Sequence, residues 1–225
     1  MKYLHWDHKT ITDFSEAAIA DLYEHGYVFT RIGKGVAQQT RSVRIDLKNF
    51  QLSSENRRIL KKVASLSLRI THLPVAEYDW NIGKLAKDFY ALKFGPDIMS
   101  AQKIKEMLTM SEKSNFNTLI TYSENGADVG YTISHLSSSI LHYSYPFYNT
   151  EHAAKDTGLG MMILAIQYAK EAGLQYVYLG SLQRPTDTYK LQFEGLEWFD
   201  GTSWKTDIEE VKNILRTATD YTIPE

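Results

Sequence analysis

Cysteine is absent from the 225-residue sequence. Its absence excludes disulfide bonds, a thiolate nucleophile and every metal site built on cysteine sulfur. No run of about 18 apolar residues occurs either, so we expect no transmembrane helix. The opening residues, MKYLHWDHKT, are polar and aromatic and do not resemble a secretory signal. These absences favour a cytoplasmic protein that does not bind a membrane.

The chain also lacks a large excess of either charge, because 25 Lys and Arg residues nearly balance 27 Asp and Glu residues and the formal net charge is only −2. A nucleic-acid partner would therefore have to be held by a local basic patch rather than by the charge of the whole protein. Hydrophobic residues make up 43% of the chain, which is enough for a substantial core and excludes global disorder. The length suits one large domain or two small ones.

The stretch from residue 141 to residue 180 has the pattern strand, loop, helix, strand. Aromatic strands are expected over residues 141–147 and 175–179. Between them, apolar residues recur at helical spacing from Gly158 onward. Gly173 stands where a helix commonly ends in the left-handed region.

The start of this helix, KDTGLG, is the first candidate site. First-turn N–H groups have no partner inside a helix, and glycines allow a ligand to approach the backbone. The motif resembles the (Arg/Gln/Lys)-x-x-Gly-x-Gly pattern with which GNAT-superfamily acetyltransferases hold the pyrophosphate of coenzyme A. A tight connection gives the same pattern. If Gly160 lies against a donor, we expect Gly160→Val to weaken donor binding while the fold survives. The predicted donor-binding residues are Lys155, Thr157, Gly158, Leu159, Gly160, Tyr143, Tyr178 and Gly180.

The order of predicted elements matches the GNAT order. Two helices, over residues 82–94 and 100–110, precede three antiparallel strands, and the glycine-containing helix and another strand follow. We therefore expect an α/β (α+β) fold with a mixed, mostly antiparallel sheet flanked by helices over residues 75–225. Residues 1–74 are expected to form a small N-terminal α/β portion packed against it, with Pro74 at the boundary. Short strands are predicted over residues 189–193 and 196–199.

A basic helix is expected after Ser53, which can cap its N-terminus. Its four cations within six positions either form a solvated face or contact RNA phosphates. The candidate tRNA-binding residues are Arg41, Arg44, Arg57, Arg58, Lys61 and Lys62.

Five stretches, kept in order over residues 20–205, resemble the aminoacyl-tRNA–protein transferases, which include arginyltransferases and their bacterial leucyl-transferring relatives. They are LYEHGYVFTRIGKG, RIDLKNFQLSSENRRILKK, FYALKFGPDIMSAQKIKEML, SSSILHYSYPFYNTEHAAKDTGLG, and YVYLG with YKLQFEGLEWFDGTSW. The resemblance implies a GNAT-type fold, an aminoacyl-tRNA donor and the N-terminal α-amine of a protein as acceptor. No cofactor beyond the donor is implied.

The sequence departs from this family in three places. The family's cysteine cluster is missing where this chain has IGKGVAQQT. After YVYLG the chain continues with SLQRPTDTYK, in which only Tyr189 and Lys190 match the family pattern. Phe94 stands where a histidine is common. The donor and the acceptor therefore need not be those of the family.

Few catalytic residues are expected, because an aminoacyl-tRNA ester is already activated and its aminolysis needs mainly positioning and stabilisation of an oxyanion. The resemblance favours Tyr189 and Lys190. The Tyr145 hydroxyl can donate a proton and Glu197 can orient an amine, unless they are an ordinary sheet tyrosine and a surface carboxylate.

No metal site is predicted, since His135, His142 and His152 lack a convincing ligand partner. Two other functions stay open: an acyl-CoA-dependent N-acetyltransferase, and a binding module that has lost catalysis. An open cleft between the strands of Tyr143 and Tyr178 would favour an enzyme, and a filled cleft would favour the module.

Overall fold

The computed structural model describes residues 3–151 and 156–217. The helices are α1 (Glu16–Glu24), α2 (Ser54–Lys62), α3 (Trp80–Phe94), α4 (Ala101–Thr109), α5 (Thr157–Glu171), the 3₁₀ helix η1 (Pro185–Gln192) and α6 (Ile208–Thr217). The strands are β1 (Asp7–Thr10), β2 (Tyr27–Phe29), β3 (Val36–Gln39), β4 (Ser42–Asp46), β5 (Leu66–His72), β6 (Thr118–Glu124), β7 (Ala127–Leu136), β8 (Ile140–Tyr148), β9 (Tyr176–Ser181), β10 (Leu196–Phe199) and β11 (Trp204–Lys205).

Eight strands form one sheet in the order β11-β10-β4-β9-β8-β7-β6-β5. Every neighbouring pair is antiparallel except β8 and β9, which are parallel. The mixed, mostly antiparallel sheet predicted from the sequence is confirmed. A second sheet, β1-β3-β2, forms the small N-terminal portion together with α1.

The chain before residue 74 contributes to both sheets. Strand β4 lies between β9 and β10, and β5 forms the outer edge beside β6. The predicted boundary near Pro74 therefore does not divide the large sheet, because strands from both sides of it are hydrogen-bonded in that sheet. Strand β5 was not predicted, since LSLRITH reads as the continuation of a basic, polar segment.

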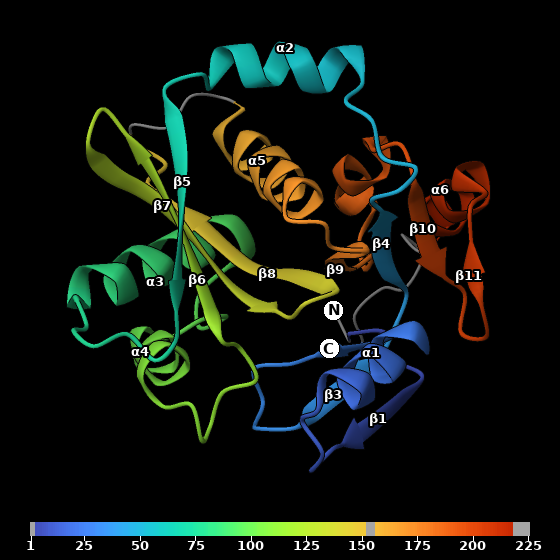
Figure 1. Cartoon of the computed structure of the whole chain (residues 1–225), viewed down its shortest axis with the longest axis horizontal. Helices are drawn as coiled ribbons and strands as arrows, with labels where there is room; N and C mark the ends of the chain where they lie inside the picture. The colour runs from blue at the N-terminus through green and yellow to red at the C-terminus, as the bar shows by residue number, and fades with distance from the viewer. Residues whose placement is uncertain (1–2, 152–155, 218–225) are drawn as a thin grey trace.

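The helices cover both faces of the large sheet. Helices α2 and α5 pack with the apolar side chains of one face, while α1, α3 and α4 pack on the other. Helix α6 covers β4 and β10 at the far end. Figure 1 shows α2 lying across the end of α5 at the top, and α1 with β1 and β3 below the large sheet.

Strands β8 and β9 pair over only three residues before they diverge. Ile140 lies opposite Tyr176, Leu141 opposite Val177 and His142 opposite Tyr178, and no further residues of the two strands pair. Helix α5 connects them, as parallel strands require a crossover. The prediction that the strands of Tyr143 and Tyr178 share one sheet is confirmed.

Several local predictions are confirmed by the backbone. Ser53 and Ser100 cap α2 and α4 through their side chains, and Gly173 has a positive φ of 77° after α5. The predicted strand over residues 189–193 is wrong, because residues 189–192 belong to η1 and Phe193 is its C-cap. The Asp187 carboxylate accepts from the N–H groups of Gln183 and Arg184, at 2.8 and 2.9 Å, and so turns the chain into that helix.

The structure argues against the expectation that the fold tolerates Gly160→Val without loss of stability. A Cβ on Gly160 would lie 2.6 Å from Cγ2 of Val63, the buried C-cap residue of α2. Gly158 is similarly constrained, because its Cβ would lie 2.8 Å from the ring of Tyr148. These glycines therefore allow α5 to pack against α2 and β8.

We predict that Gly160→Val lowers the free energy of unfolding by at least ~2 kcal/mol, because overpacking outweighs the small gain in helix propensity. Urea unfolding of Gly160→Val, Val63→Ala and the double variant tests this. The double variant should be more stable than the sum of the single changes by ~0.5–3 kcal/mol. Strict additivity would show that the two residues do not compete for space.

Candidate functional site

A cavity of about 620 Å³ opens where β8 and β9 diverge, and we call it the β8–β9 cavity. Ser144 and Tyr145 line it from β8, and Leu179, Gly180 and Ser181 line it from β9. The opposite wall comes from residues 28–32, Tyr90 and Ile98–Met99. The cleft between the two strands is open, which is the arrangement expected of an enzyme.

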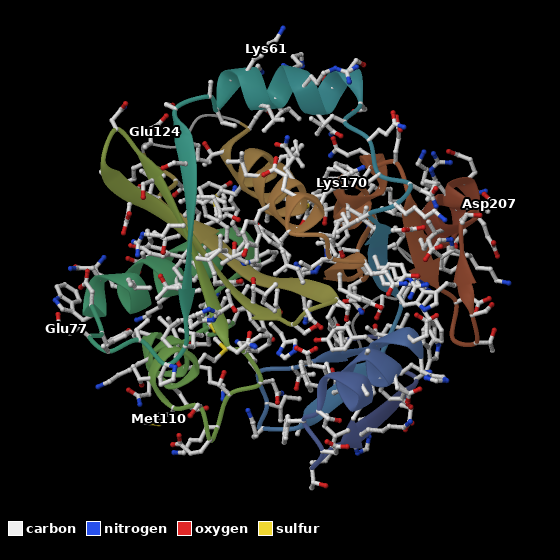
Figure 2. The ribbon with its side chains drawn as sticks, in the orientation of Figure 1. Lys61, Glu77, Met110, Glu124, Lys170 and Asp207 are labelled. Atoms are coloured by element: carbon white, nitrogen blue, oxygen red, sulfur yellow. The ribbon has the colours of Figure 1, made fainter. Side chains whose placement is uncertain are left out.

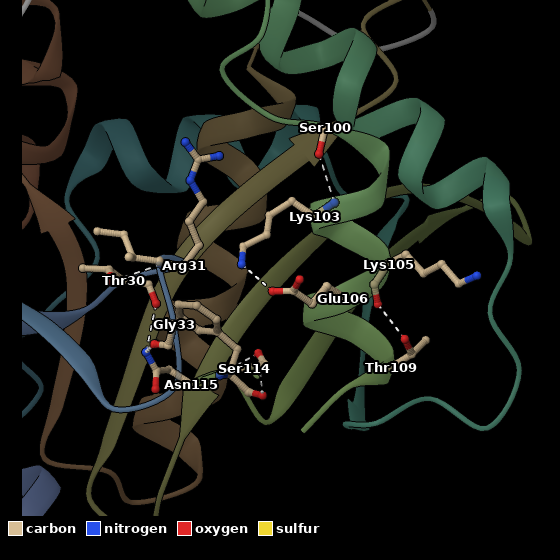
Figure 3. A network of polar contacts seen from close by, with 12 residues as sticks. Thr30, Arg31, Gly33, Ser100, Lys103, Lys105, Glu106, Thr109, Ser114 and Asn115 are labelled. Atoms are coloured by element: carbon tan, nitrogen blue, oxygen red, sulfur yellow. Dashed lines mark hydrogen bonds and ion pairs between the residues drawn. The ribbon is translucent and has the colours of Figure 1, made fainter. Parts of the chain in front are cut away.

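The wall formed by residues 28–32 is held by one buried amide. Asn115 Nδ2 donates to the carbonyl oxygens of Thr30 and Gly33, at 2.9 and 2.8 Å, and Asn115 Oδ1 accepts from Gly35 N at 2.6 Å. Figure 3 shows Asn115 beside this loop and Arg31 extending from it. Arg31 Nη1 donates to the carbonyl of Ile98 at 2.6 Å, so its guanidinium is fixed at the cavity wall.

Lys190 reaches the β8–β9 cavity from η1. Its Nζ donates to the carbonyl oxygen of Ser181, 2.8 Å away at the end of β9. Burial lowers the pKa of Lys190, and the nearby Arg184 acts in the same direction. Lys190 is thus a catalytic candidate that the structure places in the cavity, whereas the neighbouring Tyr189 is exposed and does not line it.

A β-bulge decides which tyrosines of β8 face the cavity. Ser134 pairs with Tyr143 and Ile133 with Tyr145, so Ser144 is an extra residue on β8. The bulge reverses the alternation, and bulges of this kind often re-aim a side chain beside a site. Tyr145 consequently lines the cavity, while Tyr143 is buried on the opposite face with α5. Tyr143, predicted as a donor-binding residue, therefore does not line this cavity.

Burial raises the pKa of Tyr145 to about 12, so its hydroxyl stays protonated near neutral pH. This state suits a proton donor, the role predicted for it. Among the described donor-binding candidates, Gly180 alone lines the cavity. Lys155 lies outside the described residues.

Arg44 and Glu197 are paired with one another rather than exposed to substrates. Arg44 is buried, and its guanidinium contacts the carboxylates of Glu24 and Glu197 at 2.5 and 2.6 Å. The rings of Tyr176 and Trp204 each lie 4.0 Å from the Arg44 guanidinium carbon. The predictions that Arg44 binds tRNA and that Glu197 orients an amine are therefore wrong.

Tyr178 belongs to the same buried cluster. Its hydroxyl accepts from Arg44 Nη1 at 3.3 Å, and its ring packs edge-on against Tyr23. It therefore lies in the core beside the cavity and does not line it.

The start of α5 is covered by α2 and does not open into the β8–β9 cavity. Lys62 Nζ lies 2.6 Å from the carboxylate of Asp156, the N-cap residue. Thr157 is buried and Val63 occupies the space beside Gly160. The predicted donor-binding residues Thr157, Gly158, Leu159 and Gly160 are thus separated from the cavity that the two strands form.

A second cavity, of about 760 Å³, lies between α3 and the end of β8, and we call it the acidic cavity. Its lining includes Asp79, Asp88, Asp128 and Glu151, with Lys84 as the single cation. The lining of the β8–β9 cavity has the opposite character, with Arg31 and Lys190 and no carboxylate among its described residues.

Residues 3–151 and 156–217 contain no group of three acidic or histidine side chains that could hold a metal ion. No helix in these ranges is long and apolar enough to cross a membrane.

Comparison with known proteins finds one matching family model. Residues 89–200, which include β8, α5, β9 and η1, match the model of the arginine-tRNA-protein transferase C terminus. The chain is 27% identical to an aspartate/glutamate leucyltransferase of Ruegeria pomeroyi over 169 residues, 73% of this chain and 61% of that protein. The same description applies to a relative from Chromohalobacter salexigens, 27% identical over 76% of this chain and 70% of that protein.

The chain thus spans about three fifths of the length of the Ruegeria relative. Among solved structures, the C-terminal domain of a putative lysylphosphatidylglycerol synthetase from Agrobacterium fabrum has a TM-score of 0.48 at 10% identity. That match covers 92% of this chain and 58% of the other. The resemblance to aminoacyl-tRNA–protein transferases seen in the sequence is confirmed by the family model and the curated relatives.

We predict that Arg44→Gln lowers the free energy of unfolding by about 2–4 kcal/mol. The substitution leaves the carboxylates of Glu24 and Glu197 without their cation, and the loss of stability is moderated because Glu24 is half exposed. Arg58→Gln is the matched control, since Arg58 pairs with Glu55 on the surface of α2 and should change stability by less than ~1 kcal/mol. Equal effects of the two changes in urea unfolding would contradict the structural role of Arg44.

Proposed function

We propose that the protein transfers an apolar amino acid from aminoacyl-tRNA to the N-terminal α-amine of a protein whose first residue is acidic. The family supports the reaction class, and the relatives named aspartate/glutamate leucyltransferases support both specificities. The observation that carries the proposal is the β8–β9 cavity, which combines apolar walls with two cations and no described carboxylate.

The lining of this cavity fits the two substrates differently. Val28, Phe29, Met99 and Leu179 offer an apolar surface to an aminoacyl side chain such as leucine. Arg31 and Lys190 offer charge-assisted hydrogen bonds to the carboxylate of an aspartate or glutamate. A cationic aminoacyl group such as arginine would find no described carboxylate in this lining.

The reaction requires little acid–base chemistry. The neutral α-amine attacks the ester carbonyl carbon, the bond to the ribose oxygen breaks, and that oxygen takes a proton. In this proposal the protonated Tyr145 hydroxyl, which lines the cavity, donates that proton. The proton that the attacking nitrogen loses returns through water to the Tyr145 oxygen, so the residue is regenerated. Lys190 and Arg31 hold the acceptor, so binding geometry supplies much of the rate.

An acyl-CoA donor is less well supported. A GNAT acetyltransferase would hold pyrophosphate on the first-turn N–H groups of α5. Here the C-terminal end of α2 packs on that turn, through Val63 at Gly160 and Lys62 at Asp156. A diphosphate would have to displace these contacts.

The exposed face of α2 is the proposed tRNA contact. Arg57, Arg58, Lys61 and Lys62 are all exposed on α2, and Figure 2 shows Lys61 pointing away from the body of the molecule. Arg58 and Lys62 form ion pairs, with Glu55 and Asp156 respectively. Arg57 and Lys61 form no ion pair with the described residues and are the stronger candidates.

The proposal predicts which substrates react. Purified protein is incubated with labelled leucyl-, methionyl-, phenylalanyl- and arginyl-tRNA and with acetyl-CoA, using peptides that begin with Asp, Glu, Asn, Ala or Arg. We expect an apolar residue to be added to Asp and Glu peptides. Lys190→Met should raise KM for the Asp peptide about tenfold or more, while the Asn peptide changes little.

Lys212→Met, on the surface of α6, is the control and should leave both values unchanged. Transfer from acetyl-CoA would replace the proposed donor. Binding of aminoacyl-tRNA without transfer from any donor would identify a binding module instead.

The proposed tRNA surface predicts a salt dependence. Replacing Arg57 and Lys61 by Gln should reduce the slope of log K against log salt by roughly one to two units, because each lost phosphate contact removes nearly one unit. Filter binding of tRNA between low and physiological salt measures it. Replacing Lys205 and Lys212 by Gln is the control and should leave the slope unchanged. An unchanged slope in the α2 variant would mean that this face is only solvated.

A further inference from the structure

His142 lies on β8 at the last paired position before the strands diverge, and its side chain lines the β8–β9 cavity. Only 1% of its surface is exposed. His142 Nδ1 lies 2.8 Å from the Tyr23 hydroxyl on α1. The second ring nitrogen, Nε2, has no hydrogen-bond partner among the described residues.

The hydrogen bonds around Tyr23 fix the tautomer of His142. The buried Tyr23 oxygen accepts from Phe29 N at 3.3 Å, and His142 Nδ1 is its only other partner among the described residues. The Tyr23 hydroxyl hydrogen must therefore be donated to His142 Nδ1, or it would be buried without an acceptor. Since Nδ1 accepts, the neutral imidazole carries its hydrogen on Nε2.

The imidazole remains neutral under physiological conditions. Burial, with smaller contributions from the neighbouring His135 and Lys190, lowers the pKa of His142 to about 3. The titratable groups that face the ring are Tyr23 from α1, His135 from β7 and Lys190 from η1. None of them carries a negative charge that would favour an imidazolium.

We propose that His142 is a catalytic residue whose Nε2–H donates a hydrogen bond to the carbonyl oxygen of the aminoacyl ester. This role rests on the proposed aminoacyl transfer. When the α-amine attacks, the new C–N bond forms and the carbonyl π electrons move to oxygen, where the Nε2–H bond strengthens as charge develops. When the C–O bond to ribose breaks, the carbonyl re-forms and His142 has neither gained nor lost a proton. Tyr23 is a positioning residue.

His135 provides a matched control within the same core. It is also buried, but its Nδ1 lies 3.1 Å from the carbonyl oxygen of Asn115, which can only accept. His135 therefore carries its hydrogen on Nδ1, and its Nε2 is buried without a partner. His135 does not line the β8–β9 cavity.

Kinetics of the 225-residue chain test the role. His142→Phe should lower kcat by about 10²–10³ with little change in KM, which is the loss seen when one oxyanion donor is removed. His135→Phe should leave kcat close to wild type, and Tyr23→Phe should lower kcat less than His142→Phe because the ring can then adopt either tautomer. Melting temperatures separate loss of fold from loss of rate.

A second measurement does not depend on activity. With ¹⁵N-labelled histidine, NMR of the wild type should show His142 neutral with its hydrogen on Nε2 throughout about pH 5–8. Adding the 3′-amide analogue of leucyl-adenosine should shift the His142 Nε2–H signal and leave His135 unchanged.

The outcomes distinguish the two proposals. A wild type that transfers no amino acid from any tRNA overturns the proposed function and the role of His142 with it. An active wild type whose His142→Phe variant keeps its kcat overturns only the role of His142. The same conclusion follows if the hydrogen of His142 is on Nδ1, or if the bound analogue leaves its signal in place.

Discussion

The pairing of β8 with β9 over three residues is the constraint on which the rest of the structure depends. It is the single parallel pair in the described sheet, so the chain must cross over one face, and α5 is that crossover. Beyond His142 the strands separate, and each leaves one edge without a ladder partner. The space between those edges is the β8–β9 cavity, which therefore results from where the pairing stops.

Two contacts made by remote parts of the chain complete this arrangement. Helix α2 packs on the start of α5 because Gly160 leaves room for Val63. The first turn of α5, which in a GNAT acetyltransferase would hold a diphosphate, is therefore covered by α2. On the other face, Asn115 secures residues 30–36 and thereby places Arg31 at the wall of the cavity. The cavity is thus bounded by segments that are distant in sequence, namely residues 28–32, β8 and β9. Its positive charge comes from Arg31, in a loop, and from Lys190, on η1.

Local signals in the sequence predicted most elements, since capping serines, glycine C-caps and apolar spacing act within a few residues. Of the candidates that the sequence offered, Lys190, which the family resemblance favoured, lines the cavity together with Tyr145 and Gly180. Tyr143 and Tyr145 stand two residues apart and would share a face in a regular strand, and the bulge at Ser144 separates them. Arg44 looked like a phosphate ligand because its partners Glu24 and Glu197 are far away in the sequence. His142 had no visible role because Tyr23, which fixes its tautomer, lies 119 residues earlier.

The charges of the two cavities bear directly on the reactivity of an amine. An α-ammonium group has a pKa of about 7.7–8.0, so most of it is protonated and unreactive at neutral pH. A nearby carboxylate raises that pKa and a nearby cation lowers it. In the acidic cavity, the four carboxylates would keep an amine charged. An acceptor that begins with Asp or Glu brings its own carboxylate, which also raises the pKa of its amine. In the proposed reaction Lys190 and Arg31 bind that carboxylate and offset its effect, so the two cations of the β8–β9 cavity would serve both recognition and reactivity.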